Sequence, residues 1–311
     1  MHKYILKRIL YLIPVMLGVS FIVFLIMSLT PGNPVELLLG DNYTPEAAAK
    51  ISKDLGLDQP FIFRYLKYVS SAFRGNLGIS IHTGEPVMTE IMARLPNTII
   101  LAAAAIFLAV VVGIPLGTIS AAKQYSFVDS GSMLLALVGV SMPNFWFGLM
   151  LILLFSARLN WFPPGGFEGF THLILPAITL SANSLAIITR MTRSSMVEIL
   201  RMDYVQTARA KGIHRWQVII KHALRNAMIP IVTTIGLQFG FAMGGAVLVE
   251  TIFSWPGIGR LLVDAIKWKD TPIVMAVVLI LALQFTLINL FVDIIYAFLD
   301  PRIRAQYKVV K

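Results

Sequence analysis

Charged residues fall in clusters along this chain, and long apolar stretches separate the clusters. Six stretches contain no Asp, Glu, Lys or Arg: residues 9–35, 95–122, 130–157, 169–189, 226–249 and 271–292. A helix needs about 20 apolar residues to cross the hydrocarbon core of a bilayer, and every stretch reaches that length. One such stretch could be a buried core helix, but six in one chain exceed what a soluble core needs. The pattern predicts an all-α, polytopic membrane protein with six transmembrane helices.

Composition agrees with this pattern and excludes two other classes of protein. Hydrophobic residues make up 57% of the 311 residues and charged residues 14%, whereas soluble domains are about 45–50% apolar and about 25% charged. A disordered chain combines low hydrophobicity with high net charge. The sequence contains no cysteine, which excludes thiol catalysis, disulfide bonds and cysteine-ligated metal and leaves the redox compartment open.

The distribution of basic residues predicts the orientation of the chain. The first apolar run is too long for the core of a signal peptide and lacks a small-x-small cleavage site, so we expect an uncleaved first span. Residues 1–8, 123–129, 190–225 and 299–311 would share one side and hold sixteen Lys and Arg residues against four acids. Because excess Lys and Arg mark cytoplasmic loops, both termini are predicted to be cytoplasmic. A nucleic-acid-binding protein would instead need a basic folded domain or arm.

The largest outer segment, residues 31–94, is expected to contain two helices. Thr44 is a candidate N-cap, and Pro45 suits the first helical position. This helix should end near Gly56, and a second helix should run from Pro60 to Phe73. We expect the segment to be a small docking surface or a lid, since it is too small and too broken by turns for a catalytic domain.

The largest inner loop, residues 190–226, shows helical periodicity. Apolar positions recur at steps of three and four: Met196, Val197, Leu200, Tyr204 and Ala208. Polar residues occupy the opposite face: Glu198, Arg201, Gln206 and Arg209. This pattern predicts one amphipathic helix that ends at Lys211 and Gly212, with the cation at the negative end of the helix dipole and the glycine in the left-handed conformation.

A second helix is expected over residues 214–226. Its apolar positions are Trp216, Ile219, Ile220 and Ala223. Two short helices at the membrane face would form a structured protrusion. Such a protrusion either docks another protein or rests on lipid headgroups, and the spacing alone leaves both readings open.

The spans lack the ionisable groups that pumps and secondary transporters place inside the membrane. Glu250 and Asp293 lie near span ends, where snorkelling or local pairing explains them better than a transport role. His82 has no second histidine at a metal-binding spacing and is expected to be a surface residue. The chain also lacks a phosphate-binding loop and a Ser-His-Asp arrangement. We therefore expect no enzyme activity in this chain, and energy for uphill transport would have to come from another polypeptide.

Glycines recur at steps of four or so in two spans. They are Gly113 and Gly117 in the second span, and Gly236, Gly240, Gly244 and Gly245 in the fifth. Small residues at this spacing let helices approach closely. We interpret them as packing surfaces, within the chain or against a partner subunit.

Several stretches resemble the dipeptide/oligopeptide/nickel class of ABC-importer permeases. In the inner loop these are Asp203–Gly212 (DYVQTARAKG) and His222–Ala227 (HALRNA). Elsewhere they are Pro31–Pro34, Leu55–Pro60, Gly75–Gly78, Ser141–Trp146, Glu250–Arg260 and Asp300–Arg304. The likeness keeps its order over nearly the whole chain, and together the motifs are highly specific.

The resemblance implies a type I importer fold, in which one extra N-terminal helix precedes a five-helix core, in a bacterial inner membrane. It also implies a second homologous permease subunit, two cytoplasmic ATPases and an extracytoplasmic binding protein. ATP and Mg would be bound by the ATPases, with no cofactor in this chain. By this resemblance the ATPase contacts a defined set of inner-loop residues: Asp203, Tyr204, Gln206, Thr207, Ala208, Arg209, Ala210, Lys211, Gly212, Arg225 and Asn226. The implied divisions are 1–94, a permease core 95–304 and a tail 305–311.

Two departures from the family pattern bear on this expectation. Where importers in general have Glu-Ala-Ala, this chain has Gln206-Thr207-Ala208, so a carboxylate is missing and Asp203 is a candidate substitute. The outer loop at about 158–171 is shorter than in some dipeptide permeases. Dipeptides, oligopeptides, glutathione and nickel chelates therefore stay open as substrates, with an ion-coupled transporter or channel as the alternative from another class.

Uncharged polar residues are the candidates for the lining of a translocation path. They are Asn144, Trp146, Asn183 and Gln238, together with Glu250 at the end of its span. A neutral, wet passage suits a zwitterionic peptide or a chelated metal. Substrate choice would lie largely with the separate binding protein.

Overall fold

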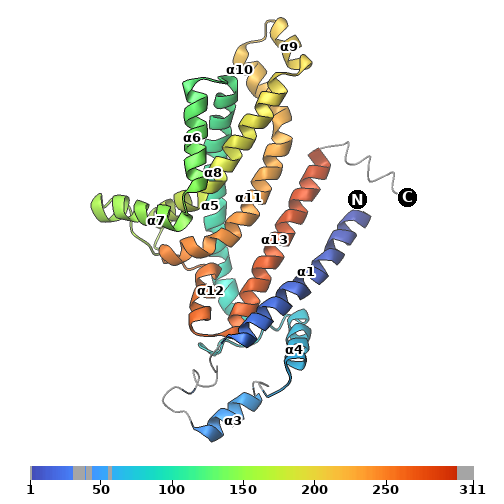
Figure 1. Cartoon of the computed structure of the whole chain (residues 1–311), viewed down its shortest axis with the longest axis vertical. Helices are drawn as coiled ribbons and strands as arrows, with labels where there is room; N and C mark the ends of the chain where they lie inside the picture. Colours follow the sequence, from blue (N-terminus) through green and yellow to red (C-terminus); the bar gives the residue numbers. More distant parts are fainter. Residues whose placement is uncertain (1, 31–38, 40–43, 55–57, 300–311) are drawn as a thin grey trace. The chain divides into compact units, whose positions relative to one another are not determined.

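The computed structural model describes residues 2–30, 39, 44–54 and 58–299. Three of the quoted motifs, at residues 31–34, 55–57 and 300–304, therefore lie wholly or partly outside the described residues, as does the tail. The described helices, in chain order, are α1 (His2–Leu29), α3 (Pro45–Asp54), α4 (Phe61–Phe73), α5 (Val87–Ala122), α6 (Phe127–Ser141), α7 (Asn144–Leu151), the π-helix η2 (Ile152–Arg158), α8 (Phe170–Leu200), α9 (Asp203–Ala210), α10 (Arg215–Gln217), the π-helix η3 (Val218–Leu224), α11 (Arg225–Ile252), α12 (Ile258–Lys267) and α13 (Thr271–Leu299) (Figure 1).

Five of the predicted spans are helices long and apolar enough to cross a membrane. Their bounds are Leu10–Leu29, Val87–Ala122, Phe170–Leu200, Arg215–Ile252 and Thr271–Val292. The predicted third span is different, because α6 and the α7–η2 helix meet at a bend of 103°. Met142 takes an extended conformation, with φ −80° and ψ 127°, as expected for a residue that precedes proline. Pro143 thus breaks a stretch that hydrophobicity alone predicted as one straight helix.

The chain divides into two compact units, and α5 and α13 contribute to both. The first unit comprises residues 1–98 and 256–286. Its main core joins the start of α5 to α12 and the start of α13 through buried residues: Val87, Ile91, Ile258, Leu261, Ala265, Ile273, Val274, Ala276 and Val277. The predicted cap is confirmed here, since the Ala47 N–H donates to the Thr44 hydroxyl at 3.2 Å and α3 starts at Pro45. The helix expected from Pro60 to Phe73 is also confirmed as α4.

The second unit comprises residues 99–255 and 287–311 as far as they are described. In it α8 packs against α6, α7 and α11 (Figure 1). Two of the predicted glycine surfaces are close helix contacts: a Cβ on Gly117 would lie 2.5 Å from the Thr189 carbonyl oxygen, and one on Gly236 would lie 2.1 Å from Val292. A Cβ on Gly244 would meet nothing within 4 Å. Packing within the chain therefore explains Gly117 and Gly236.

Candidate coupling site

The end of α8, all of α9 and the start of the next helix surround a small apolar core in the second unit. Its buried residues are Ala121, Met196, Ile199, Leu200, Val205, Ala208, Val218, Ile219, Ala223, Ala227 and Ile231. Burial of this apolar surface stabilises the corner. The protrusion is thus a packed structure, and α9 is attached to it through Val205 and Ala208.

The prediction of a single amphipathic helix in this region is wrong. The chain leaves the helix at Arg201 and Met202, so that α8 and α9 are separate helices, and Met202 is extended, with φ −72° and ψ 147°. The apolar spacing continues without interruption from the end of α8 into α9, so the sequence pattern predicted one helical face where there are two helices. Because α9 turns away from the axis of α8, Tyr204 does not lie on the predicted apolar face and is 42% exposed.

The second predicted helix is also different, because α10, η3 and α11 run on as one helical span over Arg215–Ile252. Val218 joins Ile219 and Ala223 in the core, whereas Trp216 and Ile220 are 46% and 58% exposed. A π-helical turn carries one extra residue and rotates the face that follows. The sequence offered no separate indication of this rotation.

The predicted stop at Lys211 and Gly212 is confirmed. Gly212 has φ +74°, and a Cβ built on it would meet nothing within 4 Å. Its N–H donates to the Arg209 carbonyl at 2.9 Å, and the Lys211 N–H donates to the Thr207 carbonyl at 3.0 Å. Glycine is favoured here by its left-handed backbone and not by crowding.

The structure gives Gln206, which stands where importers in general have Glu, a bond of its own. Its side-chain nitrogen donates to the carbonyl of Leu200 at 3.3 Å, which is one of the carbonyls left free at the end of α8. A glutamate cannot donate this bond. Asp203, the proposed substitute carboxylate, is exposed in the first turn of α9.

Two predicted site residues that are distant in sequence meet in this structure. The Asn226 side-chain nitrogen donates to the Tyr204 hydroxyl at 2.8 Å and to the His222 carbonyl at 3.1 Å. The bond to Tyr204 ties α9 to the following span, and the bond to His222 lies within that span. Among the remaining predicted coupling residues of α9 and its C-terminus, Ala208 is buried. The others are exposed: Asp203, Gln206, Thr207, Arg209, Ala210, Lys211 and Gly212.

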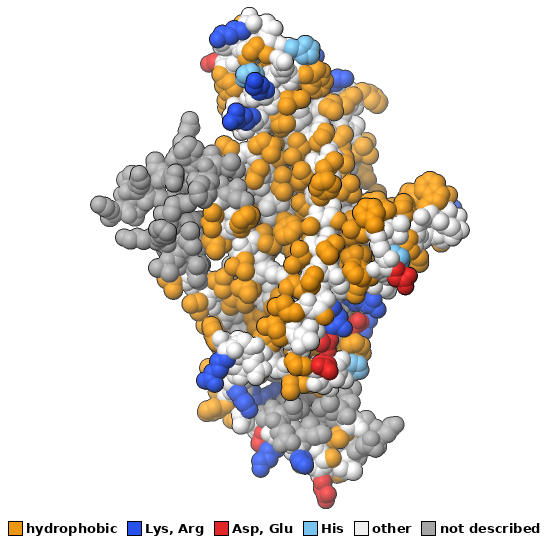
Figure 2. Space-filling view, turned by 180° about the vertical axis from the view of Figure 1, so that it is seen from behind, with side chains coloured by type: hydrophobic (Ala, Val, Ile, Leu, Met, Phe, Trp, Pro, Cys, Tyr) orange, Lys and Arg blue, Asp and Glu red, His pale blue; other side chains and the backbone are white. Residues whose placement is uncertain are grey.

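The exposed surface of the protrusion is basic. Residues 190–225 hold eight Lys and Arg residues against two acids. In Figure 2, Lys, Arg and His side chains gather at the end where Figure 1 places α9 and α10. Coulomb attraction would favour an acidic partner surface there.

A buried ion pair that sequence reasoning missed lies beside this corner. Arg193 of α8 donates from Nε and Nη2 to the two oxygens of Asp129 at 2.5 and 2.7 Å. Asp129 is 3% exposed and also accepts from the Ser120 hydroxyl and the Tyr125 N–H. A bidentate guanidinium–carboxylate pair is geometrically specific, so this one fixes how α5, α6 and α8 meet. An acid three residues after Ser126, which caps α6, was the available sequence signal.

The protrusion is also tied to α5. The Arg215 Nη2 donates to the carbonyl of Ala122, the last residue of α5, at 2.8 Å. A cation at the C-terminal end of a helix is favourable for the helix dipole. Movement of the protrusion would therefore displace the C-terminal ends of both α5 and α8.

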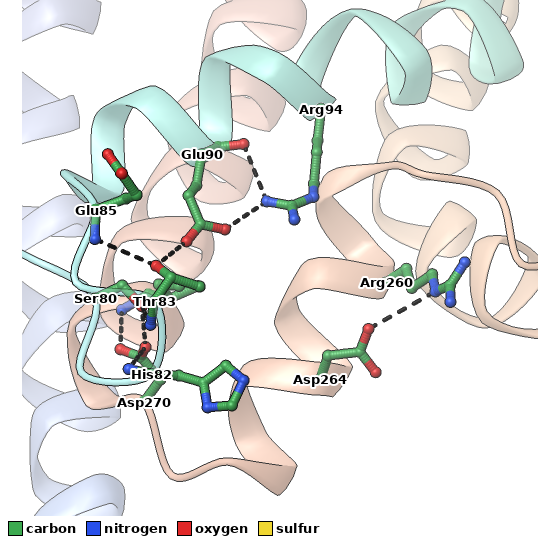
Figure 3. A network of polar contacts seen from close by, with 10 residues as sticks. Ser80, His82, Thr83, Glu85, Glu90, Arg94, Arg260, Asp264 and Asp270 are labelled. Carbon is green, nitrogen blue, oxygen red and sulfur yellow. Dashed lines mark hydrogen bonds and ion pairs between the residues drawn. The ribbon is translucent and has the colours of Figure 1, made fainter. Parts of the chain in front are cut away.

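A second polar network lies in the first unit, between the loop after residue 78 and the start of α13 (Figure 3). Asp270 accepts from the Ser80 hydroxyl at 2.5 Å and from the His82 N–H at 3.1 Å. Glu90 accepts from the Thr83 hydroxyl and from Arg94 Nη1 at 2.5 and 2.6 Å. The ring of His82 stacks on Trp268, with centroids 4.1 Å apart.

The candidates for the translocation path differ in how far they are buried. Gln238 is 6% exposed and Glu250 is 0% exposed, so both lie inside the second unit, whereas Trp146 is 43% exposed. Asn144 and Asn183 are half-buried. Trp146 borders an open, mainly apolar groove of about 540 Å³ at the bend between α6 and α7, lined by Leu137, Val138, Ser141, Met142, Pro143, Phe145 and Trp146.

Residues 113–305 match the family of the binding-protein-dependent transport system inner membrane component, and residues 1–102 match the model of the N-terminal part of such membrane components. The chain belongs to this family. It is an ABC-importer permease, a multi-pass protein of the inner membrane. Membership decides against the ion-coupled transporter or channel, and the family is one of transport permeases and not of enzymes.

Two curated relatives of the permease cover nearly its full length. It is 44% identical over 332 residues to the dipeptide transport system permease protein DppB of Alkalihalophilus pseudofirmus, covering 98% of this chain and 100% of the relative. It is 43% identical over 304 residues to the glutathione transport system permease protein GsiC of Escherichia coli strain K12, covering 98% and 99%.

A solved structure shares the fold of the permease. A chain of the MetNI methionine ABC transporter, solved in inward-facing conformations, matches with a TM-score of 0.60 at 18% sequence identity, covering 70% of this chain and 99% of that chain. The all-α permease fold predicted from sequence is confirmed. The family description names binding-protein-dependent transport, and ABC importers in general work with ATPases and binding proteins.

Proposed function

We propose that this permease carries short peptides into the cell and is driven through α9. The observation that carries the proposal is the corner itself: α9 is anchored by a buried face while its polar face and Gly212 stay exposed. A rigid, exposed helix of this kind suits a groove in another protein. ATP-driven closure of a partner pair would then pull on α9 and bias the permease between two states.

The substrate class rests on the relatives. One is named for dipeptide transport and another for glutathione, at almost equal identity. Both substrates are short peptides with free carboxylate and amino groups. We therefore place short peptides first, with glutathione-type and nickel-chelate substrates as alternatives within the same family.

The proposed assembly has one further permease subunit, two ATPases and an extracytoplasmic binding protein. ATP and Mg belong to the ATPases, and this chain holds no cofactor. The basic inner segments favour a cytoplasmic position for α9 and both termini. The proposed core is 95–304, with the coupling loop at 190–226. Of the path candidates, Trp146, which lines the groove, is the best placed to meet substrate.

The experiment is ATP-dependent uptake in proteoliposomes that contain the complete transporter. Labelled dipeptide and labelled glutathione are compared, each with its binding protein. We expect Gly212→Asp to uncouple ATP hydrolysis from uptake, because it places a charged side chain where the groove would contact bare backbone. Gly212→Asn is the matched control, since asparagine tolerates the same left-handed backbone without the charge. Full uptake by Gly212→Asp would refute the docking role of α9.

A further inference from the structure

α4 packs against the membrane-spanning helix α1 (Figure 1). Tyr65 of α4 is 8% exposed, and its hydroxyl donates to the Leu17 carbonyl at 3.0 Å and lies 3.0 Å from the Ser20 hydroxyl. The span runs over Leu10–Leu29. Ser20 is therefore roughly 13 Å along the helix axis from the last residue of the span. The Tyr65 hydroxyl binds near the middle of a transmembrane helix.

This contact has the character of a contact inside a membrane. The Ser20 hydroxyl donates to the same Leu17 carbonyl at 2.9 Å, so the three polar groups satisfy one another, as hydrocarbon surroundings demand. Phe61 and Tyr65 meet Phe21 edge-to-face, with ring centroids 5.8 and 5.3 Å apart. Such pairs stabilise by geometry as well as by area. These contacts anchor α4 to residues within the span of α1.

The flank of α4 next to its α1-facing residues carries exposed apolar side chains. Ile62, Phe63, Leu66 and Phe73 are 49%, 62%, 56% and 71% exposed. At 3.6 residues per turn they fall within a sector of about 100°. On α1, Phe21 contacts Phe61 and Tyr65 and is itself 38% exposed, and Leu25, one turn further on, is 37% exposed. The exposed apolar side chains of α4 and those of the span therefore adjoin where the two helices touch at Phe21.

Cations border this apolar sector. Lys67 and Arg74 are exposed, and Arg64 is half-buried with its guanidinium carbon 5.7 Å from the centre of the Phe24 ring. On a helical wheel these three lie together beside the apolar sector. Long basic side chains reach from an apolar surface to the phosphates of lipid headgroups. One helix thus combines an anchored face, an apolar face and a cationic edge.

We propose that α4 is an interfacial helix that inserts its apolar face into the membrane beside α1 and binds lipid phosphates with Arg64, Lys67 and Arg74. The apolar surface adjoining that of α1 and the cationic edge select lipid as the occupant. For α4 this replaces the docking surface or lid expected from sequence. α3 differs, because its exposed residues include Glu46, Lys50 and Lys53, as expected for a helix in water.

Site-directed spin labelling tests the proposal directly, because the sequence contains no cysteine. Single variants Phe63→Cys, Leu66→Cys and Lys67→Cys in α4, with Lys50→Cys in α3 as the control, are labelled in the complete transporter. The transporter is reconstituted in nanodiscs of phosphatidylethanolamine and phosphatidylglycerol. The measurement is the collision rate of each label with oxygen, which dissolves in lipid, and with a water-soluble nickel chelate.

We expect collisions with the nickel chelate at positions 63 and 66 to be about tenfold fewer than at position 50, with more oxygen collisions, because chelates stay out of the hydrocarbon. Position 67 should be intermediate. Nickel accessibility at 63 and 66 equal to that at 50 would overturn the proposal. It would also be overturned if those positions lost accessibility only after the binding protein was added, since α4 would then be a protein-docking face.

Discussion

Asp129 in one unit and Asp270 in the other are both buried at the start of a helix, with 3% and 0% exposure. Asp129 lies in the first turn of α6 and accepts both bonds of the Arg193 guanidinium. Asp270 precedes α13 and accepts from the Ser80 hydroxyl and from the N–H groups of His82 and Ile273. One carboxylate joins helices through an ion pair, and the other ties a loop to a helix through neutral donors.

The two carboxylates predict different losses of stability when a bonding partner is removed. A buried charge that loses its partner costs much more than a neutral donor that loses an acceptor. The Asp129 pair should therefore behave as an all-or-none clasp between helices. The Asp270 site should instead weaken gradually, as single donors are removed. The clasp lies beside the candidate coupling corner, so the same contrast bears on function.

The largest expected effect is that of Asp129→Ala. It leaves the Arg193 guanidinium without its carboxylate. A fully buried pair loses about 3–5 kcal/mol in the free energy of unfolding, and the loss here should lie at the lower end, because the Arg193 side chain is 25% exposed. Thermal unfolding of the purified permease in detergent should report this loss as a large drop in Tm. A Tm equal to that of the unmodified chain would show that the ion pair contributes nothing.

The double variant Asp129→Leu with Arg193→Met sharpens this result. Replacing a buried pair by apolar residues of similar volume is often neutral or stabilising. We expect Tm to recover only in part, because the Ser120 hydroxyl and the Tyr125 N–H still lack their acceptor. ATP-driven uptake should stay low, because the specific orientation of α6 on α8 is lost. Recovery of both Tm and uptake would limit the pair to a structural role.

The second expected effect is that of Asp270→Ala. Loss of the acceptor leaves the Ser80 hydroxyl and two N–H groups unpaired, at about 1–3 kcal/mol. Because the network is local, hydrogen exchange should rise in residues 79–86 and in the first turn of α13, with little change in the second unit. Ser80→Ala is the graded control and should produce a smaller rise. An equal rise throughout the chain would contradict the local character of this site.

Much of this fold followed from the sequence, because the membrane imposes a length and a composition on each span. The five unbroken spans, the Thr44 cap and the left-handed Gly212 were predicted by such local rules. The bend at Pro143 was missed, since hydrophobicity counts residues and not directions. The corner at Met202 was missed because the apolar spacing continued across it.

The contacts between distant residues could not be predicted in this way. Arg193 and Asp129 are far apart in sequence, and both were assigned to inner loops by their charge. Only helix packing brings them together. The same holds for Tyr204 and Asn226, which the family resemblance named separately and the structure joins.

A third expected effect tests the coupling corner through Gln206→Glu. The amide bond to the Leu200 carbonyl is lost, and a carboxylate is placed at the negative end of the α8 dipole, together about 1 kcal/mol or slightly more. Tm should fall by a few degrees. Gln206→Leu removes the donor without adding charge, so its Tm should fall by less. Should Gln206→Glu be as stable as the unmodified chain, the amide would not hold the corner.

The smallest expected effect is that of Tyr204→Phe. It removes the hydroxyl that accepts from Asn226, but Asn226 still donates to the His222 carbonyl, so we expect only about 0.5–1 kcal/mol. Tyr204 is 42% exposed, and water would take over part of the lost bond. The change is therefore best measured as faster hydrogen exchange in α9, with Tm almost unchanged. A loss as large as that of Asp129→Ala would show that this exposed tie, and not the buried clasp, holds the coupling corner in place.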